Sequence, residues 1–257
     1  MRPSVKLSAT VYKWGNKMYE MISLNVDVAE MPAMICAPDG EGPHPALVVA
    51  MHMPAHAGLV GDKFTEDVIQ RFADNGYVCI VPFVFYRFPL DMDRQEKREN
   101  LNDIELHQDQ EAAFQWLVEQ ENVDSNRIAI VGHCLGGRQS WLSACHNHSY
   151  KAVATMWGGN IKTGWGAGNP SPLSMTCQIS CPVIGVFGND DGNPSPEDAD
   201  NEEHALKGAG VEYEFHRYDG AGHAFMNPTS GRDPDPYRPE ASEDSWARQL
   251  AFLAKHV

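Results

Sequence analysis

Apolar residues follow two alternating patterns from residue 45 onward. Short continuous runs of aliphatic residues, of which 46–52 is typical, have the length of a strand that is covered on both faces. Between these runs apolar positions recur at helical spacing, as in 62–74, which stops before an Asn-Gly pair that commonly ends a helix. The pattern predicts strands over 46–52, 77–82, 127–131, 151–156, 182–187 and 211–218, and helices over 62–74, 102–121, 136–146, 196–208 and 239–256.

The order of these elements indicates the class of fold. Strands and helices that alternate along a chain form right-handed crossovers, which place the strands parallel in one sheet. The first 40 residues differ, because 18–28 and 31–37 predict two strands joined around Glu30 without a helix. We therefore expect an α/β protein with a mostly parallel central sheet, helices on both faces and an antiparallel N-terminal lead-in. Residues 1–257 are expected to form a single domain.

Composition and charge exclude several classes of protein. Hydrophobic residues make up 42% and charged residues 21% of the 257 residues, which argues against a disordered or fibrous chain. The net charge is −15, with 20 Lys and Arg against 35 Asp and Glu, so no nucleic-acid partner is expected. No apolar stretch reaches 18 residues, and residues 1–6 lack the apolar region of a signal peptide. These features predict a cytoplasmic protein with no membrane contact.

The cysteine and histidine spacings give little support to a metal site. The six cysteines lie mostly within apolar runs, which is typical of reduced thiols. Cys177 and Cys181 have ligand-like spacing, but no second close pair accompanies them. Pro54 prevents the helix that would align His52 with His56. We expect no metal and no cofactor, and metal-dependent hydrolysis through His52 and His56 is an alternative.

The segment 128–137 is an aliphatic run that leads into Gly-His-Cys-Leu-Gly-Gly and a predicted helix. This is the Gly-x-Ser-x-Gly nucleophile elbow with cysteine in place of serine, in the strand–turn–helix context that the motif requires. A side chain on a sharp turn needs neighbours without bulk, which Gly132 and Gly136 provide. The N–H of Leu135 and the positive end of the helix would face an oxyanion. Cys134 is thus the candidate nucleophile, and a small packing residue at a tight turn is the structural alternative.

Partners for the thiol follow downstream, each just past a predicted strand. Asp190 and Asp191 follow the strand at 182–187, and His223 lies in a glycine-rich loop after 211–218. Because parallel strands end at one edge of the sheet, these groups are expected to meet Cys134 there. The order nucleophile, acid, histidine is that of α/β-hydrolases. Either adjacent aspartate can serve as the acid, and Asp219, four residues before the histidine, is a third candidate.

Three segments resemble the dienelactone hydrolase family, the cysteine branch of the α/β-hydrolase fold: 132–137 (GHCLGG), 187–191 (FGNDD) and 221–225 (AGHAF). The resemblance runs from about residue 31 to the C-terminus. It implies an enzyme that hydrolyses carboxylic ester or lactone bonds of a small molecule, and its register makes Asp191 the acid. We expect a monomer or a small homo-oligomer.

The resemblance also implies a mechanism. His223 would accept the proton of Cys134 while Asp191 orients the imidazole, and the thiolate would attack the carbonyl carbon. An acyl-thioester intermediate would form, and water activated by the histidine would hydrolyse it. The oxyanion is expected to lie between the backbone N–H groups of Leu135 and Met53.

Two positions depart from the family pattern. His52 stands where members that hydrolyse dienelactone have a glutamate that helps to activate the thiol, and a histidine cannot supply the same negative charge. The family clamps a substrate carboxylate with two arginines, of which Arg87 matches the first while Asn227 occupies the place of the second. We expect His52, Arg87 and Trp157 to contact the substrate, which is not expected to be dienelactone itself. A surface ion pair is the alternative for Arg87, and core packing is the alternative for Trp157.

Two features permit other interpretations. An accessible cysteine of low pKa is also oxidisable, so a thiol-based redox-sensing or binding protein on the same fold is the alternative function. The predicted helix at 102–121 carries several carboxylates that could suggest a cation site, but a solvated acidic face is the commoner arrangement. These residues are Asp103, Glu105, Asp109 and Glu111.

Overall fold

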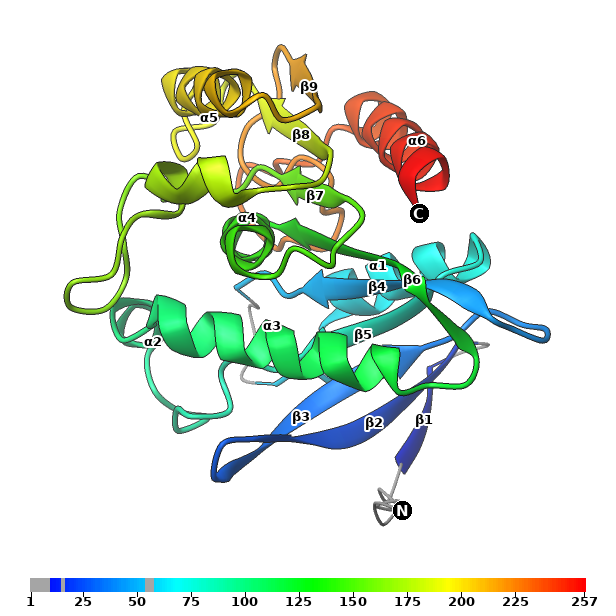
Figure 1. Cartoon of the computed structure of the whole chain (residues 1–257). Helices are drawn as coiled ribbons and strands as arrows, with labels where there is room; N and C mark the ends of the chain where they lie inside the picture. The colour runs from blue at the N-terminus through cyan, green and yellow to red at the C-terminus, as the bar shows by residue number, and fades with distance from the viewer. Residues whose placement is uncertain (1–9, 15–16, 54–57) are drawn as a thin grey trace.

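The computed structural model of the chain describes residues 10–14, 17–53 and 58–257, with side chains from Tyr19 onward. Within these residues nine strands form one sheet in the order β1-β2-β3-β5-β4-β6-β7-β8-β9 (Figure 1). The first four strands of this order pair antiparallel, and the pairs from β5 to β9 are parallel. The strands are β1 (Thr10–Trp14), β2 (Lys17–Val26), β3 (Ala29–Cys36), β4 (His44–Ala50), β5 (Val78–Pro82), β6 (Val123–His133), β7 (Val153–Met156), β8 (Val183–Gly188) and β9 (Tyr213–Tyr218). The predicted mixed sheet is confirmed.

The N-terminal hairpin differs from its prediction in the place of its turn. Glu30 lies inside β3 and pairs with Asn25, whereas the turn falls at Asp27 and Val28. Asp27 has a φ of 51°, and an aspartate tolerates this left-handed conformation better than most residues. Strand β1 was not predicted.

Helices cover both faces of the sheet, as predicted. On one face α1 (Lys63–Asp74) and α6 (Pro239–His256) lie together, and the rings of Phe72 and Trp246 join them with centroids 5.2 Å apart. The other face is covered by α3 (Asp103–Val118), α4 (Leu135–His146) and α5 (Pro196–Ala209), with the 3-10 helix η1 (Pro172–Gln178) beside them (Figure 1). Strands β5, β7 and β8 are completely buried between these layers, whereas the edge strand β9 is half-buried.

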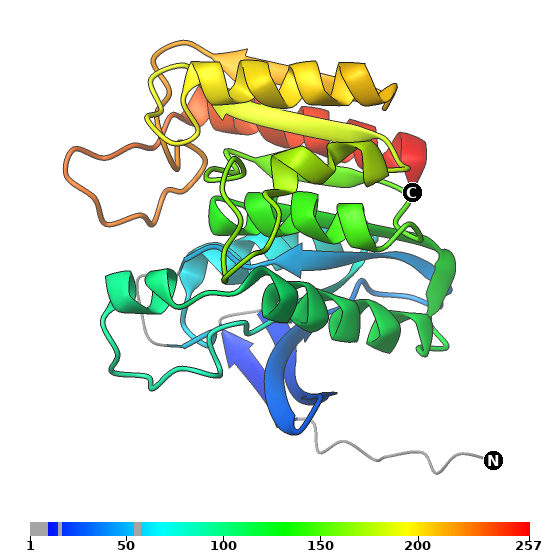
Figure 2. The ribbon, with the colours of Figure 1, turned by 60° about the vertical axis from the view of Figure 1, so that its left-hand side comes forward.

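A short helix and a long loop project from the edge at which the parallel strands end. Figure 2 shows the short helix α2 (Arg94–Glu99) and the long loop after β9 projecting from this edge. The stretch between β5 and α3 was predicted to be irregular, but Asp93 caps α2 by accepting hydrogen bonds from the N–H groups of Gln95 and Glu96. Loops at this edge are where α/β proteins place their binding sites.

The acidic residues of α3 do not form a solvated face, which corrects the sequence interpretation. Asp103 is buried and receives two hydrogen bonds from the guanidinium of Arg138 on α4. Asp109 is also buried and pairs with Arg87 at 2.6 Å. A helical sequence shows its own carboxylates but not the arginines that neighbouring segments bring to them, so these two buried ion pairs could not be predicted.

Candidate active site

The turn between β6 and α4 has the strained geometry of a nucleophile elbow. Cys134 has φ 56° and ψ −119°, a conformation that costs an L-residue about 1–3 kcal/mol. A Cβ at Gly132 would lie 2.2 Å from the carbonyl of Gly136, and a Cβ at Gly136 would lie 2.0 Å from the carbonyl oxygen of Ala50. Both glycines are therefore required by backbone contacts that leave no room for a side chain.

A continuous hydrogen-bonded chain links the thiol to a histidine and an aspartate. The Nε2 atom of His223 lies 3.1 Å from the Sγ atom of Cys134, and its Nδ1 atom lies 2.9 Å from Oδ2 of Asp191. The other two candidate acids point elsewhere: Asp190 is exposed, and Asp219 accepts a hydrogen bond from the side chain of Asn189. The three groups meet because β6, β8 and β9 all end at the same edge of the sheet.

The charges along this hydrogen-bonded series of side chains favour a Cys134 thiolate beside a His223 imidazolium. Burial raises the pKa of the Cys134 thiol, but the hydrogen bond with His223, the charges of His223 and His52 and the N–H of Leu135 outweigh it and lower the pKa to about 7. Burial lowers the pKa of His223, yet its hydrogen bonds with Asp191 and Cys134 raise it to about 10. A proton is therefore expected to reside on the histidine at neutral pH.

The two predicted oxyanion donors lie beside the thiol. Leu135 is the first residue of α4, and its backbone N–H already interacts with Cys134. Met53 is buried after β4 and lines the same cavity. Its carbonyl oxygen accepts a hydrogen bond of 3.0 Å from Nη2 of Arg94, which fixes this segment against α2.

A cavity of about 650 Å³ opens over Cys134 and is lined by three arginines that the sequence analysis missed. Arg94 and Arg98 lie one turn apart on α2, and Arg232 comes from the loop after β9. No carboxylate among the described residues pairs with these guanidinium groups. The four-residue spacing of Arg94 and Arg98, in the segment between β5 and α3, was the available signal for two of them. The cavity, which Asp93 and Asp191 also line, therefore presents three guanidinium groups without an ion-pair partner in the described part of a protein of net charge −15.

A smaller cavity of about 50 Å³ adjoins the larger one at the thiol. His52 and Trp157, both predicted to contact substrate, line it together with Cys134 and His223. The Nε2 atom of His52 lies 2.6 Å from Oδ2 of Asp62, and the ring of Trp157 meets that of His223 edge-on with centroids 6.5 Å apart. His56 lies outside the described residues. Among the residues that are described, no three His, Cys, Asp or Glu side chains are grouped as a metal site.

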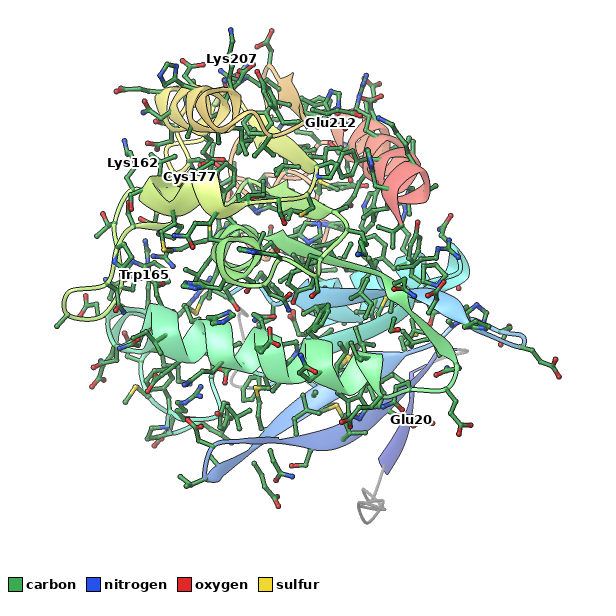
Figure 3. All side chains as sticks on the ribbon, viewed as in Figure 1. Glu20, Lys162, Trp165, Cys177, Lys207 and Glu212 are labelled. Carbon is green, nitrogen blue, oxygen red and sulfur yellow. The ribbon has the colours of Figure 1, made fainter. Side chains whose placement is uncertain are left out.

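One wall of the larger cavity is held by a buried network beneath it. Arg138 donates to the carbonyl oxygens of Asn160 and Thr163, and its guanidinium lies 3.7 Å from the ring centre of Trp165. The N–H of Trp165 in turn donates to Asp103 at 2.7 Å. Figure 3 shows Trp165 on the loop between β7 and η1, where this network fixes the segment that faces the cavity.

Comparison with known proteins agrees with the fold and the motifs. The model of the dienelactone hydrolase family matches residues 31–257. The chain belongs to the dienelactone hydrolase family. It is thus a hydrolase that acts on carboxylic ester or lactone bonds, as predicted.

Individual relatives are similar over most of their length. A Yersinia pestis protein named "Putative carboxymethylenebutenolidase" is 29% identical over 237 residues, which span 88% of this chain and 84% of that protein. A Bradyrhizobium protein named "Probable 2-oxo-3-(5-oxofuran-2-ylidene)propanoate lactonase" is 26% identical, over 88% of this chain and 89% of that protein. A crystal structure named as a "Putative Dienelactone Hydrolase" from Klebsiella pneumoniae has a TM-score of 0.79 at 26% identity, covering 92% of this chain and 98% of that one.

Neither of the two positions at which the family pattern has an arginine lines the larger cavity. Arg87 was predicted to contact the substrate, but it pairs with Asp109 and lies over the ring of Tyr86, and it lines neither cavity. Asn227 lines the smaller cavity and uses its side-chain oxygen to accept hydrogen bonds from Thr229. A contact between Arg87 and the substrate therefore stays a prediction from the sequence.

Proposed function

We propose that this dienelactone hydrolase family member cleaves its substrate through a Cys134–His223–Asp191 triad and an acyl-thioester intermediate. The observation that carries the proposal is the unbroken chain of hydrogen bonds from Asp191 through His223 to Cys134, formed by three separate strand ends. The positive φ of Cys134 supports it, because strain at one turn residue is typical of functional positions. One sheet connects all three strand ends, which supports a single domain.

In the first half of the reaction the Cys134 thiolate attacks the carbonyl carbon and forms the C–S bond. The negative charge moves to the carbonyl oxygen, where the N–H groups of Leu135 and Met53 donate hydrogen bonds. The tetrahedral intermediate then collapses, the C–O bond of the ester or lactone breaks, and the imidazolium of His223 protonates the leaving oxygen.

In the second half water attacks the thioester. His223, now neutral, accepts a proton from this water, and Asp191 stabilises the imidazolium that forms. Collapse of the second tetrahedral intermediate breaks the C–S bond and returns the thiolate beside protonated His223. A carboxylic acid leaves, and in the case of a lactone the released hydroxyl is part of the same product.

We further propose that the substrate carries a carboxylate. Arg94, Arg98 and Arg232 supply the positive charge that such a group needs, and the acidic surface elsewhere leaves the cavity as a local attractive site. The name of the Bradyrhizobium relative describes a lactone with a propanoate group, which is consistent with an anionic substrate.

Neutralising Arg98 or Arg232 is expected to weaken binding of an anionic ester selectively. We expect Arg98→Gln and Arg232→Gln each to raise KM for p-nitrophenyl hydrogen succinate about 3- to 10-fold, since both side chains are exposed and partly screened. KM for the neutral p-nitrophenyl acetate should stay within about twofold. Arg71→Gln, which breaks a surface pair with Glu243, is the matched control. Equal effects on the two esters, or none, would contradict the carboxylate proposal.

Mass spectrometry can detect the covalent intermediate. After brief exposure to a p-nitrophenyl ester and an acid quench, we expect a mass increase equal to one acyl group, located on the peptide that contains Cys134. The redox-sensing alternative predicts no acyl adduct and instead a stable sulfenic acid or mixed disulfide after peroxide treatment. Product release without any acylated thiol would exclude the thioester mechanism.

No helix in the described part of the chain has the length and apolar character that a membrane span requires. A cytoplasmic location, the absence of a nucleic-acid partner and a monomeric or small homo-oligomeric state stay predictions from the sequence.

A further inference from the structure

A second histidine–aspartate pair lies beside the thiol, on the side away from Asp191. The Nε2 atom of His52 is 2.6 Å from Oδ2 of Asp62, the residue before α1, and both side chains are largely buried. The hydroxyl of Thr65 donates to the same carboxylate oxygen at 2.6 Å. Cys134 therefore lies close to two imidazoles, and a carboxylate holds each of them.

The register of the sheet places His52 next to Cys134. Strands β4 and β6 are parallel neighbours, and Ala50 pairs with Gly132 at their ends. His52 and Cys134 each follow two residues after this pair, so they leave the sheet side by side. Both line the smaller cavity with His223.

Aromatic packing holds the His52 ring in place. Phe64 meets His52 edge-on with ring centroids 5.2 Å apart, and its other side meets His133 at 5.1 Å. Burial and the charge of His52 lower the pKa of His133 to about 3, so this neighbouring ring is neutral. Position and orientation of His52 are thus fixed by Asp62 and Phe64 together.

We propose that His52, paired with Asp62, is a positioning residue that stabilises the ionised form of Cys134 before substrate binds. The inference rests on the proposed nucleophile and goes beyond it, because it gives the resting thiolate a second imidazole neighbour besides His223. The glutamate that the family pattern has at this position would act with the opposite charge. In this chain Cys134 would already be deprotonated when the substrate arrives.

The other charged groups around the thiol are consistent with this assignment. Arg94 and Arg232 line the same small cavity from α2 and the loop after β9, and they also favour a thiolate. Asp62 is the acidic residue that lines this cavity among the described residues, and Asp93 and Asp191 line the larger one. His223 separates Asp191 from the sulfur, Asp62 holds Nε2 of His52, and Asp93 accepts hydrogen bonds from the N–H groups that begin α2.

A charge series at position 52 tests the proposal without measuring hydrolysis. The pH dependence of Cys134 alkylation by iodoacetamide, located by peptide mass spectrometry, reports the ionised fraction of the thiol. At pH 6 we expect His52→Gln to alkylate about tenfold more slowly than the wild type, since a shift of one pKa unit changes the thiolate fraction tenfold. His52→Glu should be slower still, and His52→Lys should stay close to the wild type.

Two further variants complete the experiment. Asp62→Asn should behave like His52→Gln, because the imidazole then loses the carboxylate with which it pairs. Above pH 9 the alkylation rates of the variants should become equal to that of the wild type or exceed it, since a thiolate of higher pKa is intrinsically more nucleophilic. A loss of fold would instead change alkylation at every pH. His148→Gln removes an exposed histidine and should leave the profile unchanged.

Two results would overturn the proposal: a wild-type pH profile in both His52→Gln and His52→Glu, or a His52→Lys variant that behaves like His52→Gln. The second result would mean that ring contacts matter and charge does not. Failure of the proposed hydrolytic mechanism is a separate outcome, because alkylation of Cys134 needs no ester or thioester.

Discussion

Replacement of Cys134 by alanine is expected to lower kcat/KM for a small activated ester by about 10⁴-fold or more. Without the sulfur no C–S bond can form, and His223 has no thiolate to generate. A residual rate is expected from the N–H groups that stabilise the oxyanion. Initial rates of p-nitrophenolate release, measured with circular dichroism as a check on folding, test this expectation.

Cys177→Ala is the matched control for this variant. Cys177 is a free and exposed thiol on η1, outside both cavities. Its removal should leave the rate within about twofold of the wild type. If Cys134→Ala retained activity while folded, another group would have to be the nucleophile, and the proposed mechanism would be lost.

Asp191→Asn is expected to lower kcat by about 10³- to 10⁴-fold with little change in fold. The amide no longer fixes the His223 tautomer, and it removes a negative charge that raises the pKa of that histidine. A less basic imidazole stabilises the thiolate less, so the thiol pKa rises and the acid limb of the rate profile moves to higher pH. Rates measured between pH 5 and 9 would show both the loss and the direction of the shift.

Asp190→Asn separates the two adjacent aspartates. Asp190 is exposed, and its backbone N–H bonds to Ala221, an interaction that the substitution preserves. Activity within about twofold of the wild type is expected, and Asp219→Asn should behave in the same way. A large loss in Asp190→Asn together with an active Asp191→Asn would reassign the acid.

Much of the fold follows from local sequence patterns. The buried runs in β4, β6 and β8 are continuous and aliphatic, and the amphipathic segments between them are helical. Strand β1 and helix α2 were missed because each is short and has no strong apolar periodicity of its own. Strand β1 forms by pairing with β2, a tertiary contact that a local pattern does not contain.

The positions of the candidate triad residues could be predicted from the sequence, whereas the place of the cavity arginines could not. Each member of the triad lies within a few residues of a strand end, so the sheet itself brings them together. Arg232 lies on a long loop whose path over the cavity depends on packing far from its own sequence. The burial of Asp103 likewise depends on Arg138, which is 35 residues away.

The chain separation between the reactive groups has a consequence for folding. His223 lies 89 residues beyond Cys134, and it reaches the sulfur only when β8 and β9 have joined the sheet. Contacts of such long range form late relative to local ones, because loop closure must precede them. The folded site lowers the pKa of Cys134 to about 7, and alkylation proceeds through the thiolate. At pH 6 a short pulse of alkylating agent during refolding would therefore label this thiol faster in molecules whose last strands have docked. The rate at which Cys134 is labelled would thus report when the C-terminal half of the sheet assembles.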